Sequence, residues 1–285
     1  MNASKMVPGL YLVATPIGAA RDITLRGLDI LTHADMLAAE DTRNTRRLLD
    51  IHGISLGDRR LISYHDHNAP RARPAIMQAL KEGKTVAYVS DAGTPLLADP
   101  GFDLCRAVIA EDIQVLAAPG PSALLAALCV AGQPTDRFFF AGFAPNKTTA
   151  RKKFFAEFAD IKATLIFYES PKRIHRSLID MVHSFGEERA VSVCRELTKK
   201  FEQVHRGSLG AVCDIYRGIE NPKGEFVVVL GPPVAKVADQ DEIDQALTAA
   251  LKEMRMKAAA NMIAERFGIA KKTAYARALE LKDGK

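Results

Sequence analysis

Short apolar runs alternate with amphipathic stretches along most of the 285 residues. The apolar runs are rich in β-branched and aromatic residues, whereas the stretches between them repeat their apolar positions at helical spacing. This alternation predicts an α/β protein built on sheets. The predicted strands are residues 10–15, 35–40, 61–65, 85–90, 114–118, 137–143, 164–169, 190–195, 201–206 and 225–230.

Two of the helices between these strands have clear end signals. Residues 22–34 place apolar side chains near one face behind Asp22, which is a candidate N-cap. Residues 170–185 begin with Ser170 as a candidate cap, have a proline at the first helical position and stop at Gly186. The pattern therefore predicts amphipathic helices that cover the sheets.

The character of the chain changes twice. Loops rich in Asp, Thr, Pro and Gly precede Pro121, and a plainer alternation follows it. After the last predicted strand, a polar connector with two prolines leads into purely helical patterning. We therefore expect an N-terminal α/β lobe at 1–121, a C-terminal α/β lobe at 122–233 and a small helical module at 234–285.

The C-terminal module resembles a helix-turn-helix. Residues 257–279 give a helix, a glycine turn and a second, basic helix. Its expected core residues are Ala260, Ile263, Ala264, Ile269 and Ala274. Such a unit is suited to reading DNA, to docking on RNA or to supporting a dimer.

The net charge of +5 is concentrated in the C-terminal segment 249–285. Residues 249–285 hold nine Lys and Arg against four Asp and Glu, so the rest of the chain is neutral. A basic segment on a neutral body can attach to a polyanion, because Lys and Arg contacts to phosphates supply much of the affinity for nucleic acids. A solvated helical face is the alternative interpretation.

Cysteine usage and the N-terminus indicate a cytosolic protein. The four cysteines lie in apolar stretches without zinc-finger or CxxC spacing, so we expect reduced core residues. The N-terminus lacks the apolar segment of a signal peptide, and no apolar run approaches the roughly 18 residues that span a bilayer. The four cysteines are Cys105, Cys129, Cys194 and Cys213.

Three loops could carry a ligand, because ligands collect beyond the carboxyl ends of parallel strands. Residues 14–18 lack both GxGxxG and GK[ST], which argues against a dinucleotide and ATP. Residues 90–101 contain two Asp, two Pro, two Gly and two hydroxyls, suited to a ligand with an ammonium, hydroxyls and an adenine edge. The alternative is a turn that caps a helix near Gly101. Residues 118–123 place Ser122 at a predicted helix N-cap, where free N–H groups can receive a carboxylate. The alternative is that this segment is a helix start with a structural role only.

Charged residues on other loops are candidates for the chemistry on the substrate side. General-base and phosphate-steering roles suit the histidine, the carboxylates and the arginines of these loops. His65 and His67 also resemble metal ligands, but no third ligand has suitable spacing, so we expect no metal. The segment 194–202 can equally be a surface ion-pair cluster. The candidates are Asp41, Arg43, His65, Arg195 and Glu196.

Taken together, these loops resemble one family closely: the 16S ribosomal RNA cytidine 2′-O-methyltransferases, within the tetrapyrrole-methylase fold. The resemblance spans nearly all of residues 9–230 in order, and SDAGTP together with AEDTR is its most specific part. The family usually has Asn-Leu, GFLP and Pro-His where this chain has Ala19-Ala20, GFAP and Pro171-Lys172. The matching stretches are LYLVATPIG with DITLR, AEDTR, SYHDHN, VSDAGTPLLADPG, PGPSA, FFFAGF, FYESP, RELTK with Glu202, and KGEFVVV.

The resemblance implies two α/β lobes with S-adenosylmethionine bound in the cleft between them, and a homodimer. It also implies that the substrate is a decoding-centre cytidine of 16S rRNA, within the 30S subunit. Carried over by position, the cofactor contacts are Ile17, Gly18, Asp91, Gly93, Thr94, Ser122, Ala123, Phe167, Tyr168, Gly224 and Glu225.

Methyl transfer to a ribose hydroxyl sets requirements for the site. The reaction is an in-line displacement in which positioning of the acceptor provides much of the catalysis. Some group must accept the hydroxyl proton, and the candidates are His65 and Asp41, with Glu196 third. Arg43 and Arg195 would orient RNA phosphates. Two rivals are a tetrapyrrole methylase, whose usual Gly-x-Gly first loop and GDP second loop are absent here, and a SAM-responsive nucleic-acid-binding regulator.

Overall fold

The computed structural model describes residues 6–65, 67–98, 100–219, 222–233 and 240–282. The chain separates into two compact units, Met1–Pro233 and Val234–Lys285. Each unit has its own apolar core.

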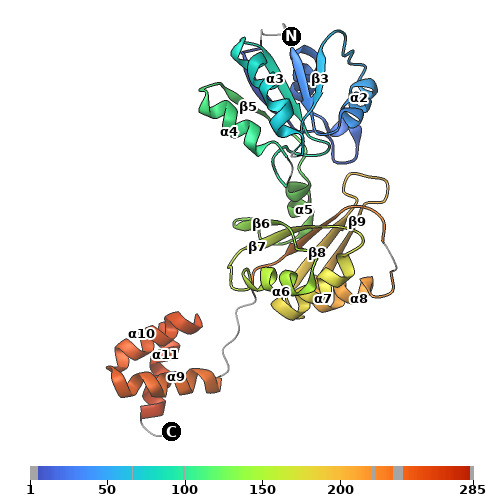
Figure 1. Cartoon of the computed structure of the whole chain (residues 1–285). Coiled ribbons are helices and arrows are strands. Elements are labelled where there is room, and N and C mark those ends of the chain that lie inside the picture. The colour runs from blue at the N-terminus through green and yellow to red at the C-terminus, as the bar shows by residue number, and fades with distance from the viewer. Residues whose placement is uncertain (1–5, 66, 99, 220–221, 234–239, 283–285) are drawn as a thin grey trace. The chain divides into compact units, whose positions relative to one another are not determined.

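The first sheet of the first unit is entirely parallel. Its strand order is β3-β2-β4-β1-β5, and helices connect its strands (Figure 1). One apolar cluster lies under α3 and α4 and another under α1 and α2, so both faces of the sheet are covered. The elements are β1 (Gly9–Val13), η1 (Ala20–Asp22), α1 (Leu25–His33), β2 (Met36–Ala39), α2 (Thr42–Ile51), β3 (Arg60–Ser63), α3 (Ala69–Lys81), β4 (Thr85–Val89), α4 (Phe102–Ala110) and β5 (Val115–Ala118).

The second sheet is mixed. Its order is β6-β7-β10-β8-β9, with β6 and β7 parallel and the other pairs antiparallel. Helices α6, α7 and α8 cover one face, where Figure 1 shows them side by side, and α5 packs on the other. The elements are α5 (Ala123–Ala131), β6 (Phe138–Phe143), α6 (Thr148–Ala156), β7 (Thr164–Glu169), α7 (Ile174–Phe185), β8 (Ala190–Arg195), β9 (Gln203–Ser208), α8 (Leu209–Tyr216) and β10 (Phe226–Leu230).

All ten predicted strands are present, and the α/β class is confirmed. The chain passes from the first sheet to the second between Ala118 and Ala123. We therefore propose lobes at 1–121 and 122–233, divided near Pro121, and a separate module at 234–285, of which residues 234–239 and 283–285 lie outside the described part of the chain.

A buried ion pair joins two helices of the second lobe. Arg151 of α6 and Asp180 of α7 are 2.6 Å apart, and their side chains are only 2% and 4% exposed. The Arg151 Nε also donates to Asp180, and its guanidinium donates to the carbonyl of Asn146 at 3.1 Å. A buried charge of this kind is tolerated only while its partner is present, because removal of the partner leaves an uncompensated charge away from water.

The second unit is a three-helix module with the predicted helix-turn-helix pattern. Its helices are α9 (Gln240–Glu253), α10 (Met256–Phe267) and α11 (Lys271–Lys282), and Gly268 ends α10 in the left-handed conformation (Figure 1). Arg277 of α11 pairs with Asp244 of α9. Of the predicted core residues, Ile269 is partly buried and the others are buried: Ala260, Ile263, Ala264 and Ala274.

Two helix starts differ from the prediction. Asp22 lies in the short helix η1, and Thr24 caps α1 by accepting a hydrogen bond from the N–H of Gly27. Helix α7 begins at Ile174, because Ser170 donates its N–H to Glu169 and accepts from the Arg173 side chain instead of capping. Its predicted end at Gly186 is confirmed.

The expectation of four core cysteines is half wrong. Cys194 and Cys213 are buried, and burial raises the pKa of the Cys194 thiol to about 11. Cys105 is half-buried, and Cys129 is exposed on α5. None of the described helices is long and apolar enough to span a membrane.

Candidate functional site

A cavity of about 400 Å³ lies where loops of the two sheets of the first unit meet. This volume is within the range of small-molecule sites. Its lining includes residues from all three loops that the sequence singled out. The lining residues are Ile17, Glu40, Asp91, Ala92, Gly93, Thr94, Leu97, Ala98, Ser122, Ala123, Phe143, Tyr168, Glu169, Ser170, Pro171, Glu225, Phe226 and Val227.

Two loops of the first lobe are locked together beside this cavity. The backbones of Thr15 and Gly93 exchange two hydrogen bonds of 2.9 Å. The Ser90 hydroxyl also donates to the Gly93 carbonyl at 2.8 Å. Gly93 has a φ of +76°, a conformation that other residues rarely adopt, and a Cβ there would lie 3.4 Å from Ile17. Glycine at this position lets the loops close up while Asp91 and Thr94 line the cavity.

The distal half of the 90–101 loop is tied to the core. Tyr88 donates its hydroxyl to the Pro100 carbonyl at 2.7 Å. Gly101 has a φ of +112°, and a Cβ there would lie 2.7 Å from the Tyr88 ring. Helix α4 begins directly after Gly101, as predicted, so the loop both caps a helix and lines the cavity. Asp99 of the same loop lies outside the described residues.

Two carboxylates of the first lobe line the cavity near each other. Glu40 accepts a long hydrogen bond of 3.4 Å from the N–H of Asp91. Asp91 in turn accepts one of 3.0 Å from the N–H of Asp41. Carboxylates in this position can attract a cationic ligand or accept hydrogen bonds from its hydroxyls.

The start of α5 leaves a polar group without a partner. Ser122 stands at the N-cap position, but its hydroxyl makes no cap hydrogen bond, which corrects the predicted capping role. The residue is 8% exposed, and its Oγ has no hydrogen-bond partner among the described residues. Buried polar atoms are nearly always paired, so an unpaired hydroxyl in a cavity wall indicates a ligand contact.

The second lobe contributes an aromatic wall. Phe143 and Tyr168 both line the cavity, with ring centroids 5.5 Å apart. Phe167, a predicted cofactor contact, is fully buried on the opposite face of β7, where its ring meets Phe155. Successive side chains of a strand point to opposite faces, so the Phe167 side chain faces away from the cavity, and Phe167 is not among the lining residues.

A charged network holds the 196–202 segment beside the cavity. The Lys199 Nζ lies 2.8 Å from both Glu196 and Glu225, and the Glu225 N–H donates to Glu196. Burial would raise the pKa of Glu196, but hydrogen bonds from Lys199 and Glu225 outweigh it and hold this pKa below its usual range. Glu196 is therefore a salt-bridged carboxylate, and Glu225 is the member of the network that lines the cavity.

Two predicted cofactor glycines contact this segment instead of lining the cavity. A Cβ on Gly18 would lie 2.5 Å from side-chain atoms of Thr198 and Lys199. Gly224 has a φ of +101°, and a Cβ there would lie 2.4 Å from the Glu196 side chain. Both glycines let the 196–202 segment approach closely. They therefore contribute to the site indirectly, by allowing this segment to pack beside the cavity.

The predicted charged pair at the start of α2 is held in place by its own members. Asp41 caps α2 through the Arg43 N–H and also binds the Arg43 guanidinium at 2.6 Å. Hydrogen bonds from the Arg43 side chain and N–H lower the pKa of Asp41 to about 2. Asp41 is thus a weak proton acceptor, and neither residue lines the cavity.

The remaining candidates also lie outside the cavity lining. The Nδ1 of His65 is buried and has no hydrogen-bond partner among the described residues, and the ring lies 6.0 Å from that of His67. Asp66 lies outside the described residues. Arg195 donates to the Lys223 carbonyl and to Gln203, which ties neighbouring segments of the second lobe together.

Glu40, Phe143 and Glu169 are among the cavity residues that the sequence analysis did not assign as cofactor contacts. Each stood in or beside a quoted motif (AEDTR, FFFAGF and FYESP), so position in a motif was the available signal. Glu169 is 3% exposed and pairs with Arg173 at 2.7 Å, which fixes the carboxylate at the cavity wall. Within the described ranges, no three His, Cys, Asp or Glu side chains gather as a metal site would require.

Most of the first unit matches a known protein family. Residues 9–213 match the family model of the tetrapyrrole (corrin/porphyrin) methylases. A solved cobalt precorrin-4 methyltransferase covers 78% of this chain and 94% of its own, with a TM-score of 0.58 and 19% identity. A uroporphyrin-III C-methyltransferase from Thermus thermophilus, complexed with S-adenosyl homocysteine, covers 78% and 97%, with a TM-score of 0.51 and 17% identity. These likenesses define a methyltransferase of the tetrapyrrole-methylase class.

The full-length relatives narrow the class. Residues 237–282 match the RsmI C-terminal HTH domain. The ribosomal RNA small subunit methyltransferase I of Mesorhizobium japonicum is 48% identical over 99% of this chain and 95% of the relative. That of Vibrio cholerae is 40% identical over 98% and 99%. The chain belongs to this family of methyltransferases.

Proposed function

We propose that the protein transfers a methyl group from S-adenosylmethionine to the ribose 2′-hydroxyl of a decoding-centre cytidine in 16S rRNA, at position 1402. The observation that carries the proposal is the cavity of about 400 Å³ that the 90–101 loop, the start of α5 and β7 form together. The similarity of the whole chain to the ribosomal RNA methyltransferases named above supports the choice of substrate.

The chemistry of the cavity wall fits this cofactor. S-adenosylmethionine carries an adenine, ribose hydroxyls, an amino-acid group and a sulfonium, which supplies the methyl group. The rings of Phe143 and Tyr168 offer an apolar face to an adenine. Glu40 and Asp91 offer acceptors to hydroxyls or to a cation, and the unpaired Ser122 hydroxyl offers one further hydrogen bond.

The residues of the chain act mainly by positioning. In-line displacement requires the acceptor hydroxyl to be held behind the methyl carbon, and exclusion of water strengthens each polar contact that does this. Backbone hydrogen bonds to Thr15 hold Gly93 in place, and the ion pair with Arg173 holds Glu169, so one wall residue from each lobe is kept rigid. This rigidity lets the binding of both partners define the geometry of transfer.

The candidate proton acceptors are His65, Asp41 and Glu196. Because Asp41 has a pKa of about 2, it stays ionised from pH 5 to pH 9 and adds no limb to the pH profile. We expect Asp41→Asn to change the single-turnover rate by the same factor at every pH in that range. A wild-type limb that disappears in this variant would show that Asp41 is the base. His65→Ala, measured in parallel, tests the alternative.

Several further features belong to the same proposal. The enzyme would act on 16S rRNA within the 30S subunit. Its site of action would therefore be the cytoplasm. The helical module, with its exposed Lys271 and Lys272, would help to dock the RNA. The active form would be a homodimer, and the site would use no metal.

Nucleoside mass spectrometry tests the proposed function directly. Cells that lack the gene should lose one 2′-O-methylcytidine from 16S rRNA, and expression of this chain should restore it. Expression of a Gly93→Val variant in the same cells is the control, because it tests whether restoration of the modified nucleoside requires an intact cavity. An unchanged nucleoside profile in the deletion strain would refute the proposal.

A further inference from the structure

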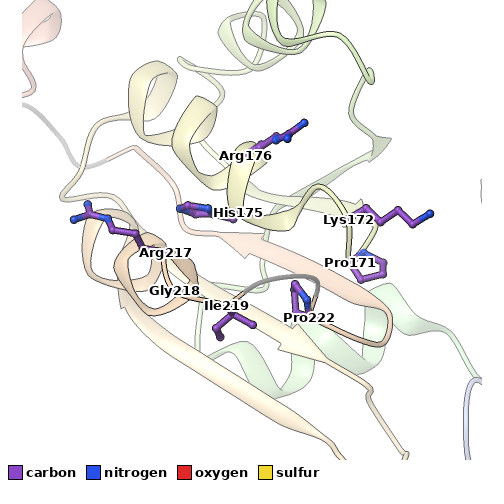
Figure 2. A pocket seen from close by; sticks show the side chains of 8 residues that line it. All are labelled: Pro171, Lys172, His175, Arg176, Arg217, Gly218, Ile219 and Pro222. Atoms are coloured by element: carbon purple, nitrogen blue, oxygen red, sulfur yellow. The ribbon is translucent and has the colours of Figure 1, made fainter.

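A second cavity, of about 340 Å³, lies in the second lobe where the start of α7 meets the end of α8. Figure 2 shows Arg217 on one side of this hollow, Lys172 on the other and His175 between them, with Ile219 and Pro222 below. Its described lining holds basic and uncharged residues and no acid. The lining residues are Pro171, Lys172, His175, Arg176, Arg217, Gly218, Ile219 and Pro222.

The basic groups of this cavity are available to a ligand. Lys172 and Arg176 are exposed, and neither has an ion-pair partner among the described residues. Arg217 pairs with Asp214 at 2.6 Å, but both side chains are largely exposed, so this pair is weak and exchangeable. Glu220 and Asn221 lie outside the described residues. The described lining therefore attracts anions.

The backbone at the start of α7 adds to this attraction. Of the first four N–H groups of the helix, those of Ile174 and Ser177 donate to the carbonyls of Ser170 and Arg173. Those of His175 and Arg176 have no acceptor among the described residues. Both residues line the cavity, so unpaired N–H groups and cationic side chains occur at the same place.

The arrangement of the cations indicates an extended anion. In Figure 2 the charged ends of Lys172, Arg176 and Arg217 point away from one another instead of converging. A single phosphate is usually held by donors that converge on it. A chain of phosphates, in contrast, can meet separated cations one after another, and contacts of that kind position a nucleic acid without reading its sequence.

The two cavities share a residue. Pro171 lines both the basic cavity and the proposed cofactor cavity. A strand whose target nucleoside enters the cofactor cavity can therefore run its backbone past Pro171 into the basic cavity. We propose that this basic cavity binds phosphodiester groups of the substrate RNA next to the target nucleotide. This inference rests on the proposed function.

The test uses a Lys172→Ala/Arg176→Ala double variant of the full chain with 30S subunits from cells that lack the gene. We expect the Kd for these subunits to rise about tenfold, because two charge-assisted contacts are lost. The slope of log K against log salt should fall by roughly 0.7 for each contact. KM should rise by a similar factor while kcat stays within about twofold, since this binding is uniform along the reaction.

A matched control removes the same charge elsewhere in the lobe. Lys153 and Lys162 are both exposed and line neither cavity, so Lys153→Ala/Lys162→Ala should leave all three quantities near wild type. S-adenosylmethionine affinity should be unchanged in both double variants. A lost cofactor affinity in the Lys172/Arg176 variant would overturn the inference, because the residues would then act on the other cavity.

Inorganic phosphate distinguishes a small anion from the RNA backbone. At matched ionic strength, phosphate should compete only weakly with 30S binding by the wild-type protein. If phosphate binds the wild type but the double variant holds 30S subunits as tightly as wild type, the cavity is a small-anion site and the inference is wrong. If the wild type itself fails to methylate 30S subunits, the proposed function fails instead.

Discussion

Gly93→Val is expected to weaken binding of the proposed cofactor by about 100-fold, measured by equilibrium dialysis with labelled S-adenosylmethionine. Gly93 is buried in the cavity wall with a φ of +76° and exchanges two hydrogen bonds with Thr15. A Cβ would already lie 3.4 Å from Ile17, and the two methyl groups of valine need further room. Both the packing of the wall and the backbone of the 90–101 loop would have to shift.

Gly53→Val separates this local effect from backbone strain. Gly53 has a similar φ of +66°, but a Cβ there would meet nothing within 4 Å. Both variants pay the strain of a valine in the left-handed region, about 1–3 kcal/mol. Only Gly93→Val should lose the cofactor. Equal loss of affinity in both variants would show that general destabilisation, not the cavity, is responsible.

The fold was predictable because its strands are buried runs with sharp ends. Both sheets have helices on both faces, so strands such as β4 and β10 are buried along their whole length and appear as uninterrupted apolar runs. Helix starts were less predictable, since several polar side chains compete for the same N–H groups. At α1 the choice fell on Thr24 over Asp22, and at α7 the Glu169 carboxylate engages Ser170.

The site was predictable in its loops but not in its charged residues. Asp91, Thr94 and Ser122 follow strands whose ends meet at the cavity, so the order of strands and loops was sufficient to find them. Gly18 and Gly224 could not be distinguished from true wall residues, because a glycine records close approach without recording what approaches. Strand alternation lets only one of Phe167 and Tyr168 turn its side chain to the cavity, so the sequence alone could have separated these two positions.

Long-range pairing explains why the charged candidates were the least predictable part. Lys199 pairs with Glu225, 26 residues further along the chain, and this contact depends on the register of β8 with β10. Glu40 is a comparable case, since it lines the cavity while its neighbour Asp41 is occupied by Arg43. Two carboxylates that are neighbours in sequence can therefore have different roles, and the roles are decided by the contacts that the fold gives to each.

Two Arg–Asp ion pairs with the same nitrogen–oxygen distance but different burial provide the second large prediction. Arg151–Asp180 and Arg43–Asp41 both have a closest contact of 2.6 Å. The first pair is 2% and 4% exposed, whereas the second is 86% and 25% exposed. Arg151→Ala should lower the free energy of unfolding by about 3–5 kcal/mol, because the buried Asp180 would lose its close partner and keep only the more distant, partly exposed Lys152 at 4.0 Å. Urea titration followed by circular dichroism measures this change.

Arg43→Ala is the matched control, and it should cost far less stability than Arg151→Ala because water screens and replaces the lost contact. Arg151→Met combined with Asp180→Leu provides a further check. If the damage in Arg151→Ala comes from the abandoned carboxylate, the double variant should recover most of the stability, since it leaves no buried charge. Equal costs for Arg151→Ala and Arg43→Ala would show that the buried pair does not hold α6 against α7. A double variant as unstable as Arg151→Ala would mean that the guanidinium acts through its hydrogen bond to the Asn146 carbonyl, which methionine cannot replace.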